Sequence, residues 1–112
     1  MLPGISQQLL AEAFVEDASV ATPAAFRNVG IVETTHLITW NTGVSSGTVE
    51  IEAANRADTP TAEWAAIATV TFSGTAPKTD SVRVAGVYKT FRHRISTIVT
   101  DGTVTSRIVG SL

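Results

Sequence analysis

The chain has 112 residues, enough for one domain that buries about two-thirds of the surface of the unfolded chain in a single core. It contains no cysteine, which excludes disulfides, thiolate metal sites and cysteine nucleophiles. The formal net charge is −2 and the basic residues are scattered, which argues against nucleic-acid binding.

The N-terminal segment, residues 1–17, lacks a basic start and has only a short apolar stretch, so we expect neither a signal peptide nor a membrane span. A short helix capped by Ser6 would place its apolar residues on one stripe, and an extended arm that adds a strand fits about as well. The pattern therefore predicts two parts, an N-terminal arm over 1–17 and a β-sandwich domain over 18–112.

Short strands and tight turns are expected in the rest of the chain, because threonine, valine, alanine and isoleucine dominate it and turn-forming residues recur at short intervals. Strand pieces are predicted at 19–21 and 25–29, separated by Pro23. A hairpin is predicted next, with strands 34–40 and 48–54.

The second strand of that hairpin alternates apolar residues with Glu50 and Glu52, which predicts one buried and one solvated face. A strand over 64–72 follows, with Trp64 and every second residue after it on one face. Strand 81–89 contains Gly86, which marks a bulge or a corner. About seven or eight strands with regular turn signals predict an all-β, antiparallel sandwich of jelly-roll type.

The C-terminal segment predicts a second hairpin, because Asp-Gly at 101–102 lies between two alternating apolar runs. In that register His93 points toward the core. Glu50 and Glu52 would form a separate acidic strip on the first hairpin. The outer face of the C-terminal hairpin carries three arginines: Arg92, Arg94 and Arg107.

Catalytic and metal-binding patterns are weak in this sequence. His36 and His93 do not have the spacing of metal ligands, and His93 is expected to be a partly buried, hydrogen-bonded histidine near the sandwich edge. Glu50 and Glu52 would lie about 7 Å apart on a solvated face, where nothing adapts them to acid–base catalysis. We therefore expect no enzyme activity, no cofactor and no bound metal.

Three runs of the sequence resemble small β-sandwich proteins of tailed bacteriophages, and most of all capsid cement or decoration proteins. They are HLITWNTGVSSGTVEIEAAN, EWAAIATVTFSG and VAGVYKTFRHRISTIVTDGTVTSRIVG. The likeness spans residues 25–110 and consists of the pattern of strand-forming and turn-forming residues. It implies a non-enzymatic protein that is made in the host cytoplasm and binds the exterior of the capsid between major capsid subunits, often as a dimer or trimer.

The resemblance also suggests which residues contact partners. Apolar residues of the arm would dock on a neighbour: Leu9, Leu10, Phe14 and Val15. The charged strips themselves fit two interpretations, ordinary solubility of the surface or docking of neighbouring subunits through complementary charge. In the second, Arg92, Arg94 and Arg107 would make the charged contacts to the major capsid protein. The alternative is a carbohydrate- or receptor-binding module of a phage tail or head fibre, which would show Trp40 or Trp64 on a flat exposed patch.

Overall fold

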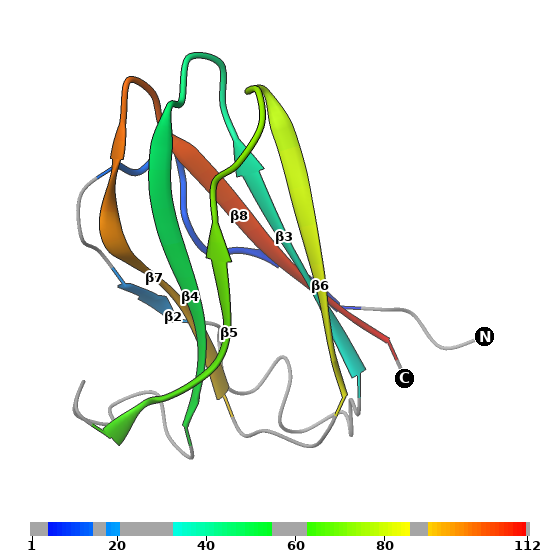
Figure 1. Ribbon diagram of the computed structural model, residues 1–112. Coiled ribbons are helices and arrows are strands. Elements are labelled where there is room, and N and C mark those ends of the chain that lie inside the picture. Colours follow the sequence, from blue (N-terminus) through cyan, green and yellow to red (C-terminus); the bar gives the residue numbers. More distant parts are fainter. Residues whose placement is uncertain (1–4, 15–17, 21–32, 55–62, 86–89, 112) are drawn as a thin grey trace.

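The computed structural model describes residues 5–14, 18–20, 33–54, 63–85 and 90–111 (Figure 1). These residues form two antiparallel four-stranded sheets that pack face to face, which confirms the predicted all-β sandwich. The strands are β1 (Ile5–Gln8), β2 (Ala18–Val20), β3 (Glu33–Trp40), β4 (Ser46–Ala54), β5 (Ala65–Thr71), β6 (Lys78–Ala85), β7 (Thr90–Thr100) and β8 (Val104–Ser111).

The strand pairs are nested within one another along the chain. The first sheet has the order β1-β8-β3-β6 and the second has the order β2-β7-β4-β5. The outermost strands in sequence, β1 and β8, pair with each other, and so do β2 with β7, β3 with β6 and β4 with β5. A long hairpin that is rolled over on itself has this arrangement.

Both predicted hairpins are wrong in their pairing, although their strands are present. The Asp-Gly turn forms, with φ of 65° at Asp101, but it leads from β7 in the second sheet to β8 in the first. The 41–45 turn likewise leads from β3 to β4 in the other sheet. Two strands that face each other across a core show the same apolar alternation as two strands of a hairpin, so the pattern does not distinguish them.

The two turns lie against each other at one end of the sandwich. Gly43 has φ of 97°, and a Cβ atom there would come within 2.5 Å of the Asp101 carbonyl oxygen. A Cβ atom on Gly102 would come within 2.8 Å of Val44. The Asn41 amide donates to the hydroxyl of Thr103. Close backbone contact and side-chain hydrogen bonds therefore fix both turns together.

The N-terminal segment that was predicted as an arm is described from residue 5 to 14, and this part belongs to the sandwich. β1 pairs with β8 over its whole length, and the short-helix alternative is wrong for residues 5–14. The predicted strand piece at 25–29 and the corner at Gly86 lie outside the described residues.

The core lies between the sheets around Trp40, which is fully buried and whose indole N–H donates to Asp80 at 2.8 Å. Alternate residues of the long strands fill it, as the sequence pattern predicted. The described residues with no exposed surface are Ile38, Trp40, Val49, Ile51, Ile95, Val104 and Ile108, together with Thr90 and two histidines.

A β-bulge in β5 changes which face the first residues of the predicted strand 64–72 occupy. The partner of Ile51 is Ala68, whereas the partner of Glu52 is Ala66, so Ile67 is an extra residue. One extra residue turns the preceding part of a strand to the opposite face. Trp64 therefore lies on the outer side of the second sheet and not with the core residues of β5.

Candidate functional site

Four charged side chains and one tryptophan gather on the outer face of the second sheet, and we call them the outer-face cluster: Glu50, Glu52, Trp64, Arg92 and Arg94. β4 and β7 are neighbours, with Glu50 opposite Arg94 and Glu52 opposite Arg92. Arg92 Nε lies 2.5 Å from Glu52 Oε1, and Arg94 Nη2 lies 2.5 Å from Glu50 Oε2. Arg94 Nε also lies 3.3 Å from Glu52 Oε2, which joins the two pairs.

Arg92 and Glu52 are the most enclosed members of the outer-face cluster. Arg92 and Glu52 are each only 4% exposed, and the guanidinium carbon of Arg92 lies 4.6 Å from the ring centroid of Trp64. A guanidinium at this distance from an indole ring makes a favourable cation–π contact. The Arg92 Nη2 atom is buried and meets no acceptor among the described residues. The cluster is therefore an internal ion network with one unsatisfied donor.

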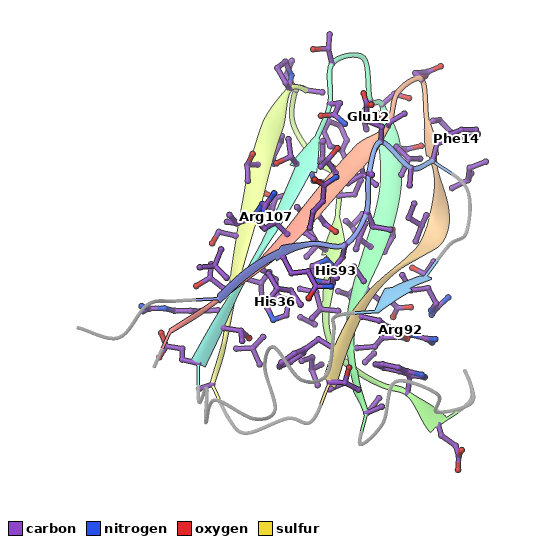
Figure 2. The ribbon with its side chains drawn as sticks, turned by 180° about the vertical axis from the view of Figure 1, so that it is seen from behind. Glu12, Phe14, His36, Arg92, His93 and Arg107 are labelled. Carbon is purple, nitrogen blue, oxygen red and sulfur yellow. The ribbon has the colours of Figure 1, made fainter. Side chains whose placement is uncertain are left out.

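The sequence prediction for the arginines is only partly right. Arg92 and Arg94 point away from the core, but they pair with Glu52 and Glu50 of the same chain, and Arg92 is buried. The acidic and basic strips thus lie on neighbouring strands and neutralise each other. Arg107 is exposed on β8 of the first sheet, apart from Arg92 (Figure 2), so the three arginines do not share a face.

The arm residues divide between the core and the surface. Leu9 and Leu10 are 7% and 1% exposed and pack in the core of their own chain. Phe14 is 51% exposed, and its carbonyl accepts from the Val99 N–H of β7. Ile98, next to that contact, is also 51% exposed and was not singled out by the sequence pattern. Val15, the fourth predicted docking residue, lies outside the described residues.

A chain of hydrogen bonds crosses the core through both histidines, and we call it the histidine bridge. His36 Nδ1 of β3 lies 2.8 Å from His93 Nε2 of β7. The second nitrogen of His36 bonds to Thr34 at 2.8 Å, and that of His93 bonds to Ser106 of β8 at 2.7 Å. Ser106 also accepts from the Leu10 N–H at 3.0 Å. The histidine bridge therefore connects the two sheets and the N-terminal segment.

Burial controls the charge of the histidine bridge. Desolvation lowers the pKa of His36 from 6.5 to about 4. Desolvation, and then the nearby charge of His36, lowers the pKa of His93 to about 3. Both rings are neutral at pH 7, so each has one N–H donor and one acceptor nitrogen for the bridge. In Figure 2 both histidines lie between the sheets, whereas Arg92 lies on the other side of β7.

The prediction that His93 points toward the core is confirmed, since His93 has no exposed surface. The predicted hairpin register around His93 is wrong, because β7 and β8 lie in different sheets, and the ring is fully rather than partly buried. The contact with His36 was not predicted, because it joins two strands of different sheets. Within the described ranges, no three histidine, cysteine or acidic side chains come together in a way that could hold a metal ion.

Two further observations bear on the site. The part of the chain that the structure describes contains no helix that is long and apolar enough to span a membrane. Comparisons of the sequence with protein-family models and with curated proteins found no match.

Proposed function

We propose that this protein is a decoration protein that binds the outside of a tailed-bacteriophage capsid and stabilises it, through self-association and contacts to the major capsid protein. The observation that carries the proposal is the nested pairing of the eight described strands of the sandwich. That order is the one expected of a jelly roll, a fold that viral capsid domains use. The sequence resemblance to cement proteins points in the same direction.

A surface that is already rigid before binding suits such a role. The charges of the outer-face cluster pair within the chain, and the histidine bridge and the interlocked turns join distant strands. A rigid partner loses little conformational entropy when it binds. Repetition on a lattice then makes many weak contacts strong together.

The alternative function is carbohydrate or receptor binding, because lectin domains also use jelly rolls. That function needs an exposed aromatic platform. Trp40 is fully buried and Trp64 is 7% exposed, so neither offers a ring to a sugar. We therefore favour capsid binding.

The test is the position of the protein in purified phage particles. We expect it to sediment with intact heads in a fixed ratio to the major capsid protein, and heads that lack it to release DNA at a lower temperature. Recovery with tails would favour the receptor-binding alternative. Recovery only as free protein would contradict both functions.

Two of the residues expected to contact partners are exposed, Phe14 and Arg107. We expect the double variant Phe14→Ser/Arg107→Glu to lower occupancy on heads at least tenfold, about 1.4 kcal/mol of binding, with an unchanged melting temperature. The matched control for the charge change is Arg83→Glu, at another exposed position, and it is compared with Arg107→Glu alone. Equal occupancy of the two variants in a sedimentation assay would contradict a role for these contacts.

A further inference from the structure

β5 forms one edge of the second sheet, and its sequence lacks the usual protection of an edge strand. It has seven residues, none of them charged and none a proline. Native edge strands are usually short, or they carry charges or proline that prevent pairing with another chain. The bulge at Ile67 distorts only its first half. The exposed residues are Ala65, Ala66, Thr69 and Thr71.

The other edges of the described sheets are protected. β6, at the edge of the first sheet, carries Lys78, Asp80 and Arg83. Lys78 pairs with Asp80 at 3.3 Å, and Arg83 pairs with Glu33 at 2.9 Å. β1 and β2 have only four and three residues. Among the described strands, β5 is thus the one edge that is both long and uncharged.

Apolar side chains reach the surface along the same side of the sandwich, and we call them the apolar seam. β5 and β6 belong to different sheets, and Figure 1 shows them diverging away from the turn that joins them. The seam consists of partly buried residues that pack on the core: Ile67, Ala68, Phe72, Ala76 and Val82. A partner that pairs with β5 would cover part of this seam, which adds apolar burial to main-chain hydrogen bonds.

The main chain of β5 can pair with another copy of itself. The Phe72 N–H donates to the Gly47 carbonyl of β4 at 3.0 Å. Hydrogen-bonding groups alternate sides along an antiparallel strand, so those of Thr69 and Thr71 point away from β4. A two-fold axis at Val70 would place Thr69 of each copy opposite Thr71 of the other. Each such pair exchanges two hydrogen bonds, and opposed threonines are favourable neighbours.

The charges near this edge favour a second copy over a charged partner. Glu50 is the acidic residue opposite Thr69 on β4, and Arg94 pairs with it. Because the β5 edge has no net charge, pairing two copies of it brings no like charges together. A charged strand of another partner would have no complementary charge on β5. We propose that two copies of this chain pair through β5, edge to edge, and join their second sheets into one continuous sheet. This inference specifies the self-association in the proposed function, and the oligomeric state of the purified protein is its first test.

The experiment is analytical ultracentrifugation of the purified protein at about 100 µM, well above a micromolar Kd. We expect a mass of about twice 11.7 kDa. Thr69→Lys should weaken the dimer at least tenfold, because it places two positive charges in the contact, while Glu50 beside it keeps the variant folded. Ser81→Lys is the matched control, since it adds the same charge at an exposed position of the β6 edge and should leave the dimer intact.

A second variant tests the main-chain bonds directly. Thr69→Pro removes an N–H that points away from β4, so it should abolish the dimer while circular dichroism shows a folded chain. Monomeric wild-type protein, or a dimer that both Thr69 variants retain, would overturn the proposal. A monomer whose binding to heads is lost in Thr69→Lys would also overturn it, because β5 would then pair with the capsid. A dimer that fails to bind heads would contradict the proposed function and leave this inference standing.

Discussion

Replacing Arg92 by alanine is expected to lower the free energy of unfolding by about 3–5 kcal/mol, measured by urea denaturation at pH 7. The variant removes the donor that lies 2.5 Å from the Glu52 carboxylate, a group that is only 4% exposed, and leaves it the longer contact to Arg94 Nε at 3.3 Å. It also removes the guanidinium that lies over Trp64. A buried charge that loses its closest partner is far more costly than the pair was worth, and the contact to Arg94 replaces only part of it.

The double variant Arg92→Met/Glu52→Leu is the informative comparison. Removing both charges also removes the unsatisfied Arg92 Nη2 atom, whose burial costs about 1–3 kcal/mol. We therefore expect the double variant to be less destabilised than Arg92→Ala alone. Arg94→Ala, at a half-buried pair with Glu50, should cost about 1 kcal/mol. A loss below about 1 kcal/mol for Arg92→Ala would show that solvent reaches Glu52.

Alternation predicted the strands well. The predicted strand 34–40 corresponds to β3 (Glu33–Trp40), and 48–54 corresponds to β4 (Ser46–Ala54). The inward direction of His93 followed from the same period of two. Side-chain alternation depends only on the local backbone, which is why a sequence pattern is enough for it.

Strand partners could not be predicted in this way. β7 and β8 follow each other across a tight Asp-Gly turn, yet each finds its partners far away in sequence, β7 on β4 and β8 on β3. Turn chemistry determines the conformation of two residues but not the sheet in which the next strand lies. The pairing of Glu52 with Arg92 depends entirely on this unpredicted arrangement.

The position of Trp64 was mispredicted for a related reason. The bulge at Ile67 has no sequence signal here such as glycine, and it reverses the face of every residue before it in the strand. The tryptophan that alternation assigned to the same face as every second residue of the strand lies on Arg92 instead. The sequence therefore showed which residue types form the candidate site, but it did not show that these residues lie together.

Acid is expected to destabilise the protein steeply because of the histidine bridge. The folded-state pKa values of His36 and His93 lie near 4 and 3, below the ordinary 6.5 that both regain on unfolding. As pH falls below 6.5 the unfolded chain takes up two protons that the folded chain does not bind, so stability is lost as pH decreases. Each proton contributes about 1.4 kcal/mol per pH unit.

We expect the free energy of unfolding to fall by about 3–4 kcal/mol between pH 7 and pH 5, measured by urea denaturation at each pH. Most carboxylates stay ionised in this window, so the histidines dominate it. The loss is a large part of the 5–15 kcal/mol that stabilises a typical domain.

The control is the double variant His36→Gln/His93→Gln, in which both side chains can donate and accept hydrogen bonds but cannot gain a proton. Its stability at pH 7 can differ from that of the wild type in either direction. The quantity to compare is therefore the slope of the free energy of unfolding against pH. We expect a nearly flat slope in the double variant and about half of the wild-type slope in each single variant. A double variant that keeps the full slope would mean that other groups bind the protons on unfolding, and that the histidine bridge is not the acid-sensitive part of the core.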